Sequence, residues 1–525
     1  MTASIEQVSG KAFDFVVIAG LVLAARLSED QDKSVLVLEA GPANLNDPLI
    51  LTPYLFGIHY NNPNYDWAFQ TIPQETLGGR SIYSGRGKTL GGSSAINFFQ
   101  FHRPSKSHID AFEKLGNPGW NWDLFSKYFD ISTNFIPPSE ESEFASHDHS
   151  NENGPLNYSY PMSYSGLERP YHQALKSIGI DVLKDPTIGT WITPVTIDPT
   201  TKTRTYAANM YYEPNMHRSN LVVLTKAHVT KVNLKTGSNG EVTATGVNFI
   251  HGEDTHTVEV RKEVVLSAGT FMSPQILELS GIGRKDVLGN AGIEVILDLQ
   301  GVGENVQEHV YSGTSFELKG EVQDQFTTFD CLRDPAVREK QTELFAHGKG
   351  AMAMSFASMT FFPLAKATPA ADDMYRDLEK SISAGIAANR YSQGLQKQYK
   401  LQLESIQRGD PVCEILMAQS YAASPNAYKK IGTAESIDSG TTLPEPGKKY
   451  ITMSSFLNNP FSRGTVHIQS SDPLQAPAID PHYFEEEHGV SASPRRACQI
   501  EPSAGQRRSL RGNINRRRSI SRTGC

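Results

Sequence analysis

The chain has 525 residues, of which 38% are hydrophobic, and this is enough for two domains and a large core. Its 42 glycines and 30 prolines suit a loop-rich α/β enzyme and are too few for a fibrous or low-complexity chain. The formal net charge is −8, and because residues 489–525 are strongly basic, the rest of the chain is more acidic than this value and is not expected to bind nucleic acid.

The cysteines and the N-terminal segment indicate the compartment. The cysteines are scattered, with neither the spacing of a metal site nor that of a disulfide framework, so they favour a reducing environment. The apolar stretch Phe13–Ala25 is interrupted by Asp14 and is too short to span a bilayer. We therefore expect a soluble, cytoplasmic chain without a signal peptide and without a membrane partner.

The first predicted unit is a strand, a helix and a second strand. Phe13–Ile18 and Ser34–Leu38 read as buried strands, and Leu21–Leu27 reads as a small-residue helix between them. The second strand ends at Glu39, nineteen positions after Gly20, where a carboxylate can accept a hydrogen bond from a ribose hydroxyl. An ordinary buried βαβ unit with an acid at the strand end is the alternative.

The turn after the first strand is unusually short. A dinucleotide-binding unit carries Gly-x-Gly-x-x-Gly between strand and helix, whereas here only Ala19-Gly20 stands there. A two-residue connection is physically possible, and a register that uses Ile18–Gly20 as the turn would shorten the strand instead. Either arrangement predicts a poorer cradle for a pyrophosphate.

A second glycine element runs from Gly87 to Asn97 and reads Gly-Lys-Thr-Leu-Gly-Gly-Ser-Ser-Ala-Ile-Asn. Its low side-chain bulk lets the backbone approach a planar or phosphorylated ligand closely. Taken alone, the run is also typical of a flexible surface loop. Farther along the chain, Leu221–Val232 and Glu263–Gly269 read as strands. The next segment reads as a helix with Pro274 in its first turn and Ser273 as its cap.

Together these segments resemble the glucose–methanol–choline (GMC) oxidoreductases, which are flavoproteins that oxidise alcohols. Residues 87–110 and 269–283 match the two signatures of that family, and the resemblance extends over about residues 13–487. It implies an α/β fold with a Rossmann-like FAD-binding domain at 13–310 and a mixed-sheet substrate-binding domain at 311–488 that is incomplete at its C-terminal end. Relatives read Gly-Gly-Gly-Thr-Ala-Gly at the first turn, so four residues are absent here.

The resemblance also implies FAD as the cofactor and assigns residues to it. The implied FAD contacts are Gly20, Glu39, Ala40, Thr89, Gly91, Gly92, Ser93, Asn97, Phe98, Phe99 and Val229, the last through its backbone at the adenine edge. His102 is either close to the flavin or, as the plainer reading has it, a hydrogen-bonded loop histidine.

The C-terminal part supplies fewer signals. Residues 372–407 have helical character, and the segment from Tyr311 to about Lys449 corresponds to the family's substrate lid. After about Glu487 the family would continue to a histidine paired with a second histidine or an asparagine, and no such segment is found. His467, His482 and His488 are not convincing substitutes, so we assign no catalytic residue.

Residues 489–525 form a basic tail with nine arginines and a single acid, Glu501. Its composition predicts disorder. A shifted reading frame or a retained intron explains such a tail, and a nuclear-localisation signal or kinase-site mimic around Arg516 is the alternative.

The expected function is therefore an FAD-dependent oxidoreductase that acts on the CH–OH group of a small-molecule alcohol, with hydride transfer to flavin N5. The chain as written would be inactive if the catalytic histidine segment is missing. A catalytically silent flavin-binding relative, or a lyase or cyclase of the same fold, remains open, and no nucleic-acid partner is expected.

Overall fold

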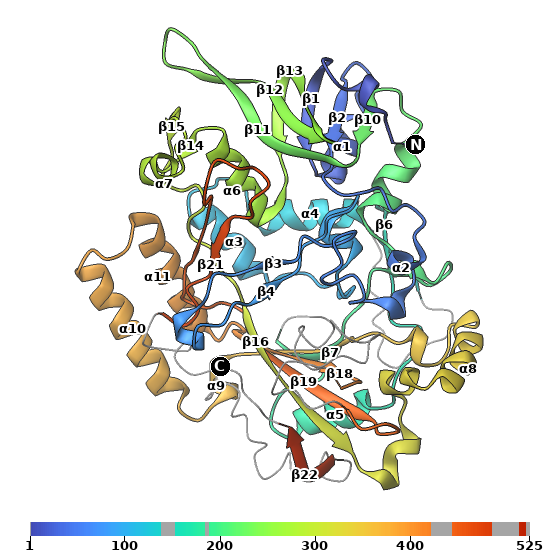
Figure 1. Cartoon of the computed structure of the whole chain (residues 1–525). Coiled ribbons are helices and arrows are strands. Elements are labelled where there is room, and N and C mark those ends of the chain that lie inside the picture. Colours follow the sequence, from blue (N-terminus) through green and yellow to red (C-terminus); the bar gives the residue numbers. More distant parts are fainter. Residues whose placement is uncertain (1, 138–152, 184–187, 422–443, 486–513, 521–525) are drawn as a thin grey trace.

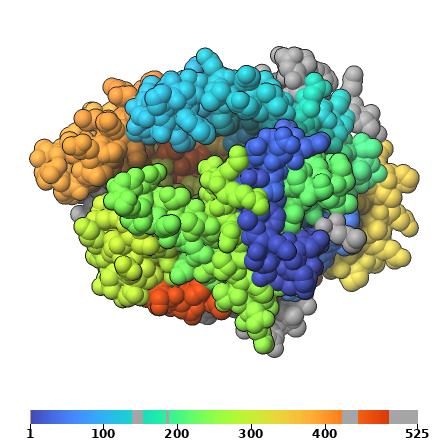
Figure 2. All heavy atoms as spheres, turned by 90° about the horizontal axis from the view of Figure 1, so that it is seen from above, coloured from blue at the N-terminus to red at the C-terminus, as the bar shows by residue number. Residues whose placement is uncertain are grey.

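The computed structural model describes residues 2–137, 153–183, 188–421, 444–485 and 514–520. Two six-stranded sheets organise these residues and lie toward opposite ends of the molecule (Figure 1). Seen from above, the dark blue N-terminal residues are flanked by green segments of residues 200–300, and the light blue segment that follows residue 100 runs along one margin (Figure 2). Within the described part of the chain, no helix has the length and apolar character needed to cross a bilayer.

The first sheet has the strand order β10-β2-β1-β13-β12-β11. Strands β10, β2, β1 and β13 pair in parallel, and β12 and β11 extend the sheet in antiparallel fashion. All four residues of Val35–Leu38 are buried, as expected for a parallel strand covered on both faces. The bounds are β1 Ala12–Ile18, β2 Val35–Leu38, β10 Leu221–Leu224, β11 Ala227–Thr236, β12 Val242–His251 and β13 Asp254–Leu266.

The predicted βαβ unit is confirmed, including its short turn. Strand β1 ends at Ile18, helix α1 spans Leu21–Leu27, and Ala19 and Gly20 between them have φ values of 60° and 75°. A Cβ on Gly20 would lie 2.9 Å from the Cβ of Ser267, so this position needs glycine both for its backbone angle and for its close approach to the end of β13.

Helix α6 (Gly269–Leu279) follows the end of β13 and corrects one prediction. The helix begins five residues before Pro274, its N-cap is Ala268, and Pro274 lies inside it, so Ser273 is not the cap. The chain turns at Ser267–Ala268 directly after the strand, and Gly269 takes a φ of 84° that starts the helix early.

The second sheet has the order β22-β16-β19-β18-β17-β7, and its neighbouring strands pair antiparallel. The predicted α/β fold is confirmed, with the parallel pairs in the first sheet. The predicted helical region around 372–407 is also confirmed: α10 and α11 bury Leu378, Ile382 and Tyr399 in the core that covers this sheet. The bounds are β7 Gly189–Ile192, β16 Val310–Leu318, β17 Ser358–Phe362, β18 Cys413–Ala418, β19 Tyr450–Leu457, α10 Ala371–Ala387 and α11 Gln393–Arg408.

The expectation of a disordered tail is wrong for Ile514–Ile520, which forms strand β22 against β16. Strand pairing uses backbone groups, so the open edge of β16 can accept a polar, arginine-rich segment that lacks the usual strand composition. The rest of the predicted tail lies outside the described residues, as does His488.

Shorter elements connect and cover the two sheets. They are α2 Pro48–Leu51, β3 Phe69–Gln70, β4 Tyr83–Ser84, α3 Lys106–Lys114, α4 Trp122–Ser132, β5 Thr133–Phe135, β6 Leu156–Tyr158, α5 Glu168–Lys176, β8 Ile197–Asp198, β9 Thr203–Arg204, β14 Ile282–Gly283, α7 Lys285–Asn290, β15 Leu297–Asp298, α8 Pro335–Ala346, α9 Leu364–Ala367, β20 Thr465–His467 and β21 Ala478–Asp480.

Candidate functional site

A cavity of about 150 Å³ lies where the carboxyl ends of β1, β2 and β13 meet. Ligands of open α/β sheets bind at this edge. Of the residues predicted to hold the cofactor, Glu39, Ala40, Gly92, Ser93 and Val229 line this one cavity. Three segments that are far apart in the sequence therefore come together at this cavity.

Glu39 is the buried acid of the cavity. Its Oε1 accepts a hydrogen bond from the Gly41 N–H at 2.8 Å, and no described residue donates to its Oε2. Burial raises the pKa of Glu39 to about 8, although the Gly41 N–H and the charge of Lys88 oppose this shift. A buried carboxyl group with one oxygen left unpaired toward a cavity suits a ligand hydroxyl that can donate to it.

The glycine-rich loop is closed on itself beside the cavity. The N–H of Gly87 donates to Ser93 Oγ at 3.1 Å. A Cβ on Gly87 would lie 2.3 Å from the carbonyl carbon of Gly92, so only glycine permits this packing. The loop thereby presents Gly92 and Ser93 to the cavity with little side-chain bulk.

Asp66 fixes the segment that leads into this loop. Its carboxylate is 1% exposed and accepts hydrogen bonds from the backbone N–H groups of Asn61, Ala68 and Arg86 and from the hydroxyl of Tyr83. A carboxylate that accepts several backbone N–H bonds holds those peptide groups in one geometry.

Arg204 braces the other side of the loop, and the sequence reasoning missed it. Its guanidinium is fully buried, donates to the carbonyls of Ile50, Ser94 and Asn97 and to Asn97 Oδ1, and stacks 3.9 Å from the Phe99 ring centroid. Burial lowers the pKa of Arg204 to about 9. An arginine within Thr-Lys-Thr-Arg-Thr has no apolar periodicity, so no local signal marks it as buried.

The other predicted contacts do not line the cavity. Gly20 packs on Ser267, Gly91 on the Tyr206 ring, and Thr89 bonds to Asn44 and Pro42. Asn97 and Phe99 face Arg204, and Phe98 joins the ring of Phe56, 5.3 Å away between centroids. The direct contact of these residues with a cofactor stays a prediction.

Several lining residues were not predicted. They include Trp67, Arg86, His228 and Phe271. The Lys88 Nζ lies 4.5 Å from the Trp67 ring centroid, and the Arg86 guanidinium lies 4.8 Å from that of Phe271. The aromatic residues of Asn64–Gln74 are a local sign that this segment can line an apolar cavity. The sequence does not show which of the rings faces the cavity.

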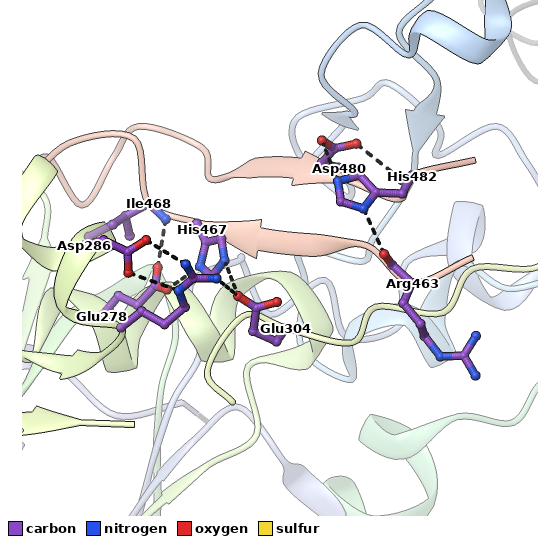
Figure 3. A network of polar contacts seen from close by, with 9 residues as sticks. Glu278, Asp286, Glu304, Arg463, His467, Ile468, Asp480 and His482 are labelled. Atoms are coloured by element: carbon purple, nitrogen blue, oxygen red, sulfur yellow. Dashed lines mark hydrogen bonds and ion pairs between the residues drawn. The ribbon is translucent and has the colours of Figure 1, made fainter. Parts of the chain in front are cut away.

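The histidines near the end of the described chain belong to a separate polar network (Figure 3). His467 Nδ1 contacts Glu278 at 2.6 Å and its Nε2 contacts Glu304 at 3.3 Å, while Glu304 also pairs with Arg284. Burial by itself lowers the pKa of His467, but the two carboxylates outweigh burial and raise it. His467 therefore joins β20 to helix α6, and its contacts with the two carboxylates favour the protonated ring.

Neither histidine of this region lines the cavity. His482 Nδ1 lies 2.9 Å from the carbonyl oxygen of Arg463, and its Nε2 lies 3.1 Å from Asp480 (Figure 3). The ring of His102 lies 5.4 Å from that of Phe361, between centroids, and it too is absent from the cavity wall. Our prediction that no catalytic residue can be assigned stays a prediction.

The residues present fit the adenosine half of a dinucleotide better than its pyrophosphate. Glu39 supplies a buried acceptor, and Ala40 and Val229 supply small or backbone surfaces beside it. In the turn after β1, the Ala19 N–H already donates to the Leu38 carbonyl. The turn therefore has no run of free glycine amides for a pyrophosphate.

Comparisons with known proteins agree with this architecture. A family model described as GMC oxidoreductase matches residues 13–311. The dehydrogenase mpl7 of Monascus purpureus is 35% identical over 491 residues, which cover 90% of this chain and 77% of that protein. Versicolorin B synthase of Aspergillus parasiticus is 30% identical over 534 residues, which cover 96% of this chain and 75% of that protein.

A solved structure is similar in fold as well. An FAD-dependent oxidoreductase from Chaetomium thermophilum superposes with a TM-score of 0.75 at 28% identity, covering 95% of this chain and 81% of that one. The similarity thus extends over both sheets and beyond the residues that the family model matches.

Proposed function

Because this chain belongs to the GMC oxidoreductase family, we propose that it is an FAD-dependent oxidoreductase acting on the CH–OH group of a small-molecule alcohol. One observation supports this most directly. Glu39, Gly92, Ser93 and Val229, which come from three separate segments, line one cavity at the carboxyl ends of a parallel sheet. The family's FAD-dependent members, including the Chaetomium thermophilum oxidoreductase, make FAD the cofactor to test first.

Within this proposal each residue has a definite task. Glu39 accepts a hydrogen bond from a ribose hydroxyl, and the backbone at Val229 faces the adenine edge. Gly92 and Ser93 let the loop approach the cofactor, while Arg204 holds that loop from behind. Bound flavin would supply the hydride acceptor, and the protein supplies position and electrostatics.

The proposal assigns no catalytic base. A positioned general base contributes roughly 10²–10⁴-fold to such a reaction, so without one we expect turnover to be lower by about that factor. We also propose that residues 13–310 form the cofactor-binding domain and residues 311–488 the substrate-binding domain, with strand β7 of the first range joining the second sheet.

The visible spectrum of the purified chain, recorded with and without added FAD, tests this function. We expect flavin absorption bands that stay with the protein through gel filtration. Anaerobic addition of alcohols from a panel of aryl and aliphatic compounds should bleach them slowly. Protein that stays colourless in excess FAD would contradict the proposal, and the Glu39→Ala variant, with weaker retention, serves as the matched control.

A second function rests on the similarity to a synthase. Versicolorin B synthase is 30% identical over nearly the whole chain, so a non-redox reaction on the same fold is the alternative. Flavin bands that do not bleach with any alcohol would favour it. Mass spectrometry of candidate substrates would then separate a synthase, which changes the substrate without a two-hydrogen mass loss, from a silent flavin-binding protein.

A further inference from the structure

We propose that Arg86 binds the phosphate groups of the nucleotide in this cavity and replaces the glycine amides that the turn after β1 lacks. The inference rests on the proposed function, because it takes the cavity to be a nucleotide site. It adds a phosphate-binding side chain that neither signature of the family resemblance assigned.

The backbone of Arg86 is held rigidly. Its N–H donates to Oδ1 of the buried Asp66 at 2.9 Å, and its carbonyl accepts from the Trp67 N–H at 2.9 Å. The side chain therefore leaves from a fixed point on the cavity wall, which reduces the entropy lost when it binds a ligand.

The side chain has hydrogen-bonding capacity to spare. Arg86 lines the cavity, its guanidinium packs over the Phe271 ring, and its Nη1 donates to the Gly85 carbonyl at 2.7 Å. Among the described residues its only carboxylate neighbour is Glu308, whose Oε2 lies 3.8 Å from Nη2, beyond hydrogen-bond distance. A guanidinium carries five N–H donors, and most of these remain available.

The surroundings suit a phosphate. Arg86 precedes Gly87, which is bonded to Ser93 Oγ, and no atom lies within 4 Å of where a Cβ on Gly92 would stand. A cation, a hydroxyl group and open backbone thus meet on one wall of the cavity. Arginine pairs with phosphate through two parallel N–H bonds, which is stronger than a single neutral hydrogen bond.

The turn after β1 explains why such a residue is needed. Ala19 uses its N–H on the Leu38 carbonyl, and a Cβ on Gly20 would collide with Ser267, so this turn is packed against the sheet. A second cation, Lys88, follows Arg86 by two positions and lies over the Trp67 ring. Its charge acts on Glu39, whose pKa it lowers against the effect of burial. The positive charge of the site is therefore concentrated on residues 86–88.

Calorimetric titration with adenosine and with ADP tests the proposal without relying on turnover. We expect the natural chain to bind ADP more tightly than adenosine. The Arg86→Met variant should lose roughly ten- to a hundredfold in ADP affinity, the range for a charge-assisted contact. Its adenosine affinity should stay unchanged, which also reports that the variant is folded.

Two further variants sharpen the comparison. Arg86→Lys keeps the positive charge but cannot donate two parallel N–H bonds to a phosphate. Its ADP affinity should therefore lie between those of Arg86→Met and the natural chain. Lys231→Gln removes an exposed cation from β11, the strand that carries Val229, and should leave both affinities unchanged. The ADP affinity of the natural chain should also fall more steeply with salt than that of Arg86→Met.

Each negative result has a distinct meaning. An Arg86→Met chain that keeps the full preference for ADP over adenosine would overturn the role of Arg86 and leave the proposed function standing. A natural chain that binds neither adenosine nor ADP would overturn the nucleotide site itself, and with it both proposals.

Discussion

Two glycine-containing turns meet at the same cavity, and they are held in different ways. The turn Ala19–Gly20 is fixed by the strand and helix that it joins, by the bond from the Ala19 N–H to the Leu38 carbonyl and by its packing on Ser267. The loop at 87–97 is held by Asp66 on one side and by Arg204 on the other, both buried. The conformation of the first turn is set by its length, whereas the conformation of the loop is set by buried residues from elsewhere in the chain.

This difference shows that the conformation of a turn and its capacity to bind a ligand depend on different features. A loop anchored through its own carbonyl and N–H groups keeps its conformation whatever occupies the cavity, because the anchors belong to the folded core. A turn that has been shortened still folds, since two left-handed residues suffice to connect β1 to α1. What it loses is the set of free amides that would contact a ligand.

The anchored loop should be the more sensitive of the two to a single substitution. Arg204→Met would leave the carbonyls of Ile50, Ser94 and Asn97 buried without a donor. We expect the free energy of unfolding to fall by about 3–5 kcal/mol in urea denaturation. Arg261→Met, at an exposed site, should change it by less than about 0.5 kcal/mol. A loss below about 1 kcal/mol in Arg204→Met would show that the loop does not depend on this anchor.

Lengthening the short turn should restore what it lacks. Inserting four residues so that the turn reads Gly-Gly-Gly-Thr-Ala-Gly adds free amides at the start of α1, and we expect FAD affinity to rise roughly ten- to a hundredfold. Fluorescence titration measures this. The same insertion with alanines in place of the three added glycines is the control, because it restores length without the close approach. Equal affinities for the two insertions would contradict the explanation.

The acid at the end of β2 contributes to binding through one hydrogen bond. Glu39→Ala should weaken adenosine binding about tenfold, as expected for one bond to a buried acceptor. Calorimetric titration of the variant measures the change. Glu29→Ala, at an exposed position just after α1, should bind adenosine as the natural chain does. Unchanged adenosine affinity in Glu39→Ala would place the ligand elsewhere.

The smallest expected effect concerns the contact between α6 and β20 that His467 makes. The folded-state pKa of His467 is raised, so its stabilising contribution is complete below about pH 6.5, the ordinary histidine value, and is lost as pH rises through the folded value. His467→Gln should therefore lower the free energy of unfolding by about 1 kcal/mol at pH 6 and by less at pH 9. His217→Gln, at an exposed site, should show no such pH dependence in the same urea series. A pH-independent loss in His467→Gln would exclude an ion-pair role.

The local elements could be predicted from neighbouring residues alone. The apolar runs at 13–18 and 34–38 predict buried strands, the turn between Ile18 and Leu21 has room for only two residues, and Glu39 follows directly from the end of the second strand. Such features depend on neighbouring residues, so their periodicity and glycine content can be read along the chain.

Which residues line the cavity, and which residues hold its loop in place, became visible only in the folded chain. Arg204 reaches Asn97 across 107 positions, and His467 reaches Glu278 across 189 positions. Contacts over such distances leave no period in the sequence, and a charged residue shows no local sign that it will be buried. The predicted Asn97 therefore proved to face Arg204, and Thr89 proved to bond to Asn44 and Pro42, while Arg86 and Trp67 line the cavity.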